Sequence, residues 1–120
     1  MALFTGKGDD GTTYFFGSKA RFGKDTPLVE ALGTLDELNS LLGLVKAKIR
    51  GRTSKGGPTS REIVEEIQQN LFIIQAELAG ADKHITEEKV RDAERLVNKI
   101  EKNLPPIKTF FIPGTNEESA

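Results

Sequence analysis

Apolar residues recur three or four positions apart in three separate segments of the chain. In residues 27–49 this stripe consists of Val29, Leu32, Leu35, Leu38, Leu42, Val45 and Ile49. In residues 60–79 it consists of Ile63, Ile67, Leu71, Ile74 and Leu78, and in residues 87–104 of Val90, Ala93, Leu96, Val97 and Ile100. Steps of three and four place side chains on one face of a helix, so each segment predicts an amphipathic helix. Three such helices with short connectors predict an all-α fold, an up-and-down helical bundle in one domain.

The ends of the first helix carry recognisable signals. Asp25 or Thr26 can cap the free N–H groups of the first turn, and Pro27 suits the first helical position. Gly33 and Gly43 interrupt the helix; each is either a tolerated glycine or a point where a neighbour comes close.

Capping signals also bound the other two helices. Thr59 with Glu62 three residues later matches a capping box, and Gly80 is expected to end the second helix. Thr86 is expected to cap the third helix, which Pro105 and Pro106 terminate.

Two polar residues, Asp36 and Asn39, lie three apart beside the stripe of the first helix. Such a position is typical of the solvated border of an apolar face. The connector at residues 50–58 is basic and turn-rich, and we expect a solvated loop there.

Composition narrows the function classes. The 120 residues are 37% apolar and 29% charged, with a net charge of −1, so no overall field favours nucleic acid or an anionic membrane as a partner. The chain has no cysteine, which excludes disulfides and zinc–thiolate sites, and the single histidine, His84, is expected to be a connector residue. No secretory pattern and no apolar run of about 20 residues are present, so we expect a cytoplasmic protein without a membrane span.

The main candidate for chemistry is the glycine-rich run from Thr5 to Thr13. It offers closely spaced backbone N–H groups, hydroxyl groups and one cation, which together suit a polyphosphate. The alternative is a loop without a ligand. Residues 6–11 match the string G-x-G-x-x-G, but no strand precedes it and no parallel-sheet pattern follows, so a dinucleotide fold is rejected.

Several segments taken together resemble the PduO-type ATP:cob(I)alamin adenosyltransferases. The run Thr5-x-Lys7-Gly8-Asp9-x-Gly11-x-Thr13 is similar to the opening motif of that family. The block at residues 21–40, the helix segments at 67–72 and 77–79, and the motifs Leu104-Pro105-Pro106 and Phe110-x-x-Pro113-Gly114 follow in the order of the family. The resemblance spans nearly the whole chain.

This resemblance implies transfer of the 5′-deoxyadenosyl group of ATP to reduced cobalamin, in a helical homotrimer with sites between subunits. Cobalt is the nucleophile, so no protein nucleophile is expected; the protein holds the triphosphate, with Mg²⁺, and positions the two substrates. A cobalamin reductase and a cobalamin-dependent mutase are the implied partners. The alternatives are a non-catalytic ATP or cobalamin sensor or carrier with this fold, and a plain helical interaction module.

The resemblance also assigns residues. The implied ATP-binding residues are Thr5, Gly6, Lys7, Gly8, Gly11, Thr13 and Lys24, with Arg21 assisting. Asp36 is implied to bind the corrinoid and to pair across the subunit interface. Phe110 matches an aromatic residue that displaces the lower axial ligand of cobalamin, which makes cobalt easier to reduce.

The family pattern continues beyond the Pro-Gly turn into further helices that also bind ATP. We therefore expect this chain to be a fragment or a shortened form with exposed apolar stripes and little activity alone. The sequence divides into a phosphate-binding region at 1–26, helices at 27–104 and a C-terminal segment at 105–120.

Overall fold

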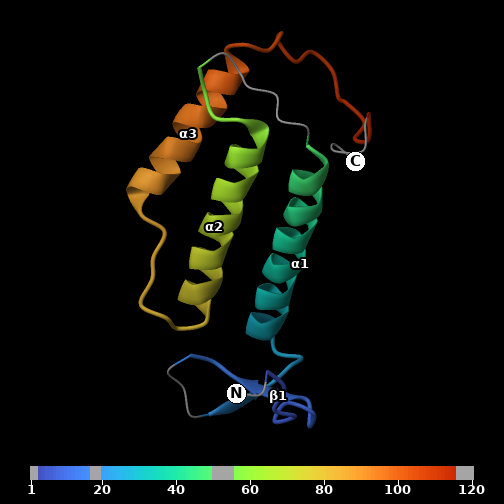
Figure 1. Cartoon of the computed structure of the whole chain (residues 1–120), viewed down its shortest axis with the longest axis vertical. Coiled ribbons are helices and arrows are strands. Elements are labelled where there is room, and N and C mark those ends of the chain that lie inside the picture. The colour runs from blue at the N-terminus through green and yellow to red at the C-terminus, as the bar shows by residue number, and fades with distance from the viewer. Residues whose placement is uncertain (1–2, 17–19, 50–55, 116–120) are drawn as a thin grey trace.

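The computed structural model describes residues 3–16, 20–49 and 56–115 of the chain (Figure 1). Within these residues the fold has three helices and two strands: β1 (Thr12–Tyr14), β2 (Arg21–Gly23), α1 (Pro27–Lys48), α2 (Ser60–Leu78) and α3 (Glu87–Glu101). The helices run up, down and up, and the strands lie below the N-terminal end of α1 and the C-terminal end of α2 (Figure 1). Residues 50–55 of the predicted basic connector lie outside the described residues.

The two strands correct the prediction of a purely α fold. β1 and β2 pair antiparallel, with Thr12 opposite Gly23 and Tyr14 opposite Arg21, in the region 1–26 for which no strand was predicted. Threonine, tyrosine and phenylalanine favour extended backbone, and the rings of Phe15 and Phe22 pack with centroids 4.8 Å apart. Three-residue strands are too short to give a period-two pattern, so the protein is mainly helical with one small sheet.

The predicted side-chain cap of α1 is wrong. Thr26 occupies the N-cap position, but its side chain makes no capping hydrogen bond, and its hydroxyl oxygen is buried without a partner among the described residues. Pro27 supplies the start instead, because its fixed φ suits the first turn and its nitrogen has no hydrogen to satisfy.

The predicted ends of α2 are confirmed, and those of α3 in part. Thr59 and Glu62 form the full capping box, and Gly80 follows the C-cap of α2 at φ +90°. The Thr86 side chain accepts a hydrogen bond from the Lys89 N–H at 3.3 Å. However, α3 already ends at Glu101, in a turn before Pro105, so the prolines prevent continuation rather than end the helix themselves.

α1 packs antiparallel against α2, and the prediction for Asn39 fails at this contact. Asn39 is half-buried and hydrogen-bonded to α2 instead of lying in a solvated border. Gly43 faces the same helix, since a Cβ atom there would lie 3.4 Å from Gln68 Nε2, whereas Gly33 faces open space. Asp36 is exposed, as predicted for the border of the stripe.

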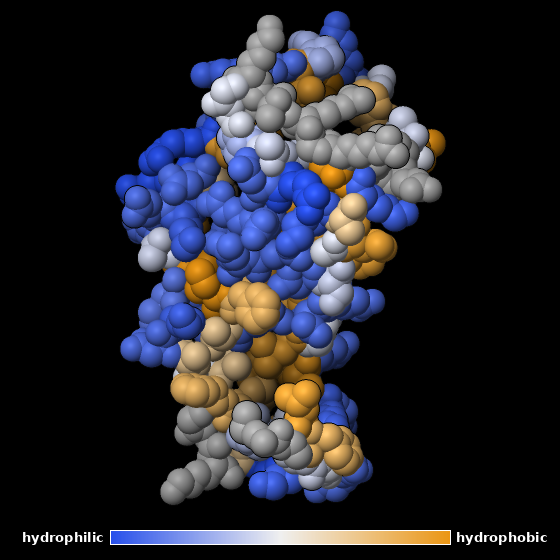
Figure 2. Space-filling view, in the orientation of Figure 1, coloured by the Kyte–Doolittle hydropathy of each residue, from blue (hydrophilic) through white to orange (hydrophobic). Residues whose placement is uncertain are grey.

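No described side chain is fully buried. The apolar residues of the helices remain partly open, including Leu44 of α1 at 56% exposure and Val97 of α3 at 62%. In Figure 2 much of the apolar surface gathers over the lower ends of α1 and α2, next to the strands. The helices therefore form an open layer whose apolar faces are available for further contacts. None of the described helices is long and apolar enough to cross a membrane.

Candidate functional site

The glycine-rich run folds into two consecutive tight turns. The Asp9 N–H donates to the Gly6 carbonyl at 3.1 Å, and the Gly11 N–H donates to the Gly8 carbonyl at 3.1 Å. Gly6 and Gly11 have φ values of +68° and +82°, in the left-handed region that glycine adopts without strain. Two of the three glycines are thus required by backbone conformation.

The third glycine, Gly8, is required because a side chain there would meet neighbouring atoms. A Cβ atom on Gly8 would lie 3.1 Å from the Thr12 carbonyl oxygen and 3.2 Å from the Lys24 ammonium nitrogen. The Lys24 N–H also donates to the Gly11 carbonyl at 2.9 Å, so the backbone after β2 is tied to the loop. Lys24 therefore brings its charge directly against the Gly8 backbone, although 16 positions separate the two in sequence.

Arg21 closes the loop from the opposite strand. Its Nη2 donates to the Lys7 carbonyl at 2.6 Å and to the Thr12 carbonyl at 2.9 Å, and its Nε donates to the Thr12 hydroxyl at 2.7 Å. The guanidinium lies 5.9 Å from the centre of the Tyr14 ring. The two ends of the turn, residues 7 and 12, are held together by this one side chain.

Asp10 completes the same network. Its carboxylate accepts from the Thr12 hydroxyl and from the Thr12 N–H, the latter at 3.0 Å. The hydrogen bonds from the Thr12 side chain and backbone, with a smaller effect of the Arg21 charge, lower the pKa of Asp10 below its ordinary value of 3.8. Asp10 is thus ionised at neutral pH and is tied to Thr12 by two hydrogen bonds.

The loop and Lys24 present two cations with no carboxylate partner among the described residues. Lys7 and Lys24 are both exposed, and no ion pair is recorded for either. Thr5 is exposed, and its hydroxyl oxygen accepts a hydrogen bond from the Lys7 backbone N–H at 3.4 Å, while Thr13 is half-buried in β1. Two free ammonium groups beside a tightly turned, glycine-rich backbone suit an anion with several phosphates.

The described residues include no group of three or more histidine, cysteine or acidic side chains placed to hold a metal ion.

The predicted corrinoid residues lie elsewhere. Asp36 is exposed on α1, and Phe110 is fully exposed at 104% in the segment after α3. That segment runs past the upper ends of the helices, opposite the end where β1 and β2 lie (Figure 1). One chain thus brings Lys7, Gly8 and Lys24 together but leaves Phe110 apart from them.

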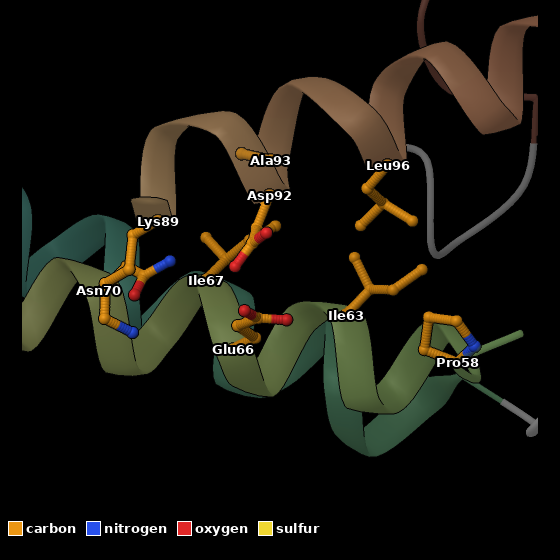
Figure 3. Close-up of a pocket in the computed structure, with 9 residues that line it drawn as sticks. All are labelled: Pro58, Ile63, Glu66, Ile67, Asn70, Lys89, Asp92, Ala93 and Leu96. Carbon is orange, nitrogen blue, oxygen red and sulfur yellow. The ribbon is translucent and has the colours of Figure 1, made fainter. Parts of the chain in front are cut away.

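A cleft between α2 and α3 was not predicted. Its volume is about 320 Å³, and Ile63, Ile67 and Leu96 face it, with Lys89 and Asp92 at its edge (Figure 3). These apolar residues belong to the predicted stripes, but periodicity gives the direction of a stripe and not the distance between two helices. The cleft contains none of the predicted site residues.

Sequence reasoning also missed the roles of Asp10 and Thr12. The loop motif drew attention to glycines and lysine, whereas Asp10 acts through its hydrogen bonds with Thr12, and Thr12 through its hydrogen bonds with Arg21 of β2. Asp10 and Thr12 stand in the run as ordinary loop residues, and an aspartate or threonine in a glycine-rich loop is too common to be a specific signal.

Comparison with known proteins gives consistent matches. A family model described as cobalamin adenosyltransferase matches residues 3–120. The chain is 35% identical over 127 residues to the corrinoid adenosyltransferase PduO of Citrobacter freundii, covering 100% of the chain and 36% of that protein. It is 38% identical over 125 residues to another corrinoid adenosyltransferase of Citrobacter freundii, covering 98% of the chain and 67% of that protein.

A solved structure is also similar. A variant PduO-type ATP:corrinoid adenosyltransferase from Lactobacillus reuteri, complexed with cobalamin and ATP, matches with a TM-score of 0.85 and 30% identity. The match covers 98% of this chain and 64% of that chain. The chain therefore spans about a third to two thirds of the length of these relatives.

Proposed function

The chain belongs to the cobalamin adenosyltransferase family, and we propose that it acts in transfer of the 5′-deoxyadenosyl group of ATP to cob(I)alamin. The products are adenosylcobalamin and triphosphate. The observation that carries the proposal is the loop itself: Lys24 lies against Gly8, within two consecutive tight turns of the backbone.

The reaction needs no nucleophile from the protein. The cobalt of cob(I)alamin supplies the electron pair for the new Co–C5′ bond, while the bond from C5′ to the phosphate oxygen breaks and its electrons leave with triphosphate. Negative charge grows on that oxygen, and fixed cations that neutralise it lower the barrier. The protein then contributes alignment and electrostatic stabilisation.

In this proposal Lys7 and Lys24 neutralise the triphosphate, which arrives as its magnesium complex. Gly6, Gly8 and Gly11 allow the backbone to approach it. Thr5 and Thr13 flank the loop as hydroxyl donors. The region 1–26 is then the phosphate-binding part of the domain, ahead of the helices at 27–104 and the segment 105–120.

Asp36 and Phe110 are proposed to meet the corrinoid. Phe110 is the apolar wedge against the lower axial face of cobalamin, and its full exposure leaves it free for such a contact. Because the segment after α3 runs past the ends of the helices that lie opposite the loop, we propose that loop and wedge of different copies form one site (Figure 1). A homotrimer of this kind would also cover apolar helix faces that are open in one chain.

The reaction consumes a strongly reduced corrinoid. A cobalamin reductase that delivers cob(I)alamin and a cobalamin-dependent mutase that uses the product are therefore the protein partners we propose.

The test is a single-turnover assay without oxygen, in which excess chain is mixed with Mg-ATP and chemically reduced cobalamin. Excess protein makes even a slow reaction visible as conversion of the cob(I)alamin spectrum to that of adenosylcobalamin. We expect conversion to fall about tenfold or more in Phe110→Ala and to change little in the matched control Phe111→Ala.

Other outcomes identify the alternatives. Binding of Mg-ATP and cobalamin without Co–C bond formation would indicate a sensor or carrier. No response to either substrate would indicate a plain helical module and would contradict the proposal.

A further inference from the structure

We infer that Arg21 is a positioning residue that holds the phosphate loop in its binding shape and does not itself bind phosphate. That the ligand is a phosphate rests on the proposed function. The arrangement of Arg21 and the loop is observed without nucleotide and does not depend on it. The family resemblance implies that Arg21 assists in phosphate binding, but its observed hydrogen bonds point to a different role.

Within the described part of the chain, the side-chain hydrogen bonds of Arg21 go to oxygens of residues 7 and 12. Nη2 binds the carbonyls of Lys7 and Thr12, and Nε binds the Thr12 hydroxyl, at distances between 2.6 and 2.9 Å. These are charge-assisted bonds of good length, and a guanidinium offers them in a fixed planar arrangement. A lysine ammonium at this position cannot reach all three acceptors with the same geometry.

The bond to Lys7 has a direct consequence for Gly8. The Lys7 carbonyl and the Gly8 N–H belong to one planar, trans peptide unit, so they point in opposite directions. Holding the carbonyl toward Arg21 turns the Gly8 N–H to the other side. Among the residues that the structure describes, no acceptor is recorded for this N–H. Arg21 thereby fixes one free donor for a phosphate oxygen, and hydrogen bonding at the carbonyl strengthens the N–H as a donor.

Thr12 extends the clamp along the loop. Its hydroxyl accepts from Arg21 and donates to Asp10, so its hydrogen and a lone pair are both used. Asp10 also accepts from the Thr12 N–H. Arg21, Thr12 and Asp10 therefore form one continuous chain of bonds that reaches from residue 7 to residue 12.

The sheet fixes Arg21 itself. The residue lies on β2 opposite Tyr14, and its guanidinium is within cation–π distance of the Tyr14 ring, 5.9 Å from the centroid. A side chain held by its strand, a ring and three loop oxygens has little freedom to move to an incoming phosphate. Among the described residues of this region, Lys7 and Lys24 then remain as the cations available to a phosphate.

Four variants test the clamp: Arg21→Ala, Arg21→Lys, Thr12→Val and the double variant Arg21→Ala/Thr12→Val. Without nucleotide, the NMR order parameters of the Gly8 and Gly11 amides are expected to drop from about 0.85 to below about 0.6 in both Arg21 variants. With nucleotide, affinities for Mg-ATP and for inorganic triphosphate are expected to fall about tenfold in Arg21→Ala and in Arg21→Lys alike. Affinity for cobalamin should stay unchanged, which a general loss of structure would not produce.

Thr12→Val should lower the affinity for Mg-ATP and triphosphate by part of the same factor. The double variant should bind them no more weakly than Arg21→Ala alone, since both changes break one chain of hydrogen bonds. A wild-type triphosphate affinity in Arg21→Lys, with a loss in Arg21→Ala only, would identify Arg21 as a phosphate ligand and overturn the inference. So would unchanged order parameters in Arg21→Ala. If the unmodified chain binds no Mg-ATP, the proposed function fails, while the order parameters still decide whether Arg21 is a clamp.

Discussion

Asn39 on α1 and Gln68 on α2 each donate a side-chain amide hydrogen to the backbone carbonyl of the other. The Nδ2–O distance is 3.4 Å and the Nε2–O distance is 3.1 Å, and both groups are partly buried. About two turns away, Gln75 Nε2 lies 3.5 Å from the Leu32 carbonyl oxygen. Amide bonds to helix carbonyls specify the register of α1 against α2 more sharply than apolar contacts do, because they require one alignment.

Gly43 is predicted to be necessary for this register. Gly33→Gln should stabilise the chain by about 0.5 kcal/mol, because glutamine favours the helix and the position faces open space. The same substitution at Gly43 would crowd Gln68 and should destabilise the chain by about 1–3 kcal/mol. Urea denaturation of the two variants measures both changes. Equal effects at the two positions would show that Gly43 makes no special room for Gln68.

Thr59 is predicted to contribute more to stability than its neighbour Ser60. Thr59→Ala removes a capping box in which the Glu62 N–H donates to the hydroxyl at 3.1 Å, and should cost about 1 kcal/mol. Ser60→Ala, at the next position, should have little effect. Thermal unfolding of both variants provides the comparison, and a larger loss in Ser60→Ala would contradict the observed cap.

The connector between α2 and α3 is predicted to depend on pH through His84. Its Nδ1 lies 3.1 Å from Glu77 Oε1, and Glu77 also accepts from the Ile85 N–H at 3.4 Å. The hydrogen bond with Glu77, followed by the Glu77 charge, raises the pKa of His84 above its ordinary value of 6.5. The hydrogen bond from His84 is also the main reason that the pKa of Glu77 is lowered from 4.5.

The stabilisation from these two groups changes with pH in opposite directions. The stabilisation from His84 is fully present below pH 6.5 and is lost as pH rises through the raised pKa. The stabilisation from Glu77 is present above pH 4.5 and is lost as pH falls through the lowered pKa. Both groups are exposed, so the effect on overall stability should be small, but NMR titration of the His84 ring should resolve it.

Two variants control the titration. Glu77→Gln should return the pKa of His84 toward 6.5, whereas Asp82→Asn should change it less, because Asp82 is a minor cause and lies 3.6 Å from Nε2. A His84 ring that titrates below 6.5 in the unmodified chain would contradict this geometry.

The sequence was sufficient for the helices because their signals are local. Stripes, the capping box at Thr59 and the glycine after α2 are read within a few residues, and the structure places α2 as they predict. β1 and β2 were missed because their pairing is a contact between short segments that individually lack a pattern.

The same distinction applies to the candidate site. The glycines and lysines of the loop belong to a motif and were found, although their role in ATP binding stays a prediction. Three features depend on the three-dimensional arrangement, which residue types alone do not encode. They are the clamp formed by Arg21, the bridge formed by Asn39 and the separation of Phe110 from the loop. The missing cap at Thr26 shows that even a local signal can be overridden by the surrounding chain.

An NMR titration of the chain with Mg-ATP shows whether the loop with Lys24 binds the triphosphate of ATP. We expect saturable shifts of the Gly6, Gly8 and Gly11 amides. We also expect an affinity at least about tenfold weaker in Lys24→Ala and unchanged in the control Lys99→Ala on α3. Shifts confined to the cleft between α2 and α3, or equal affinities in the two lysine variants, would show that the loop does not bind the triphosphate.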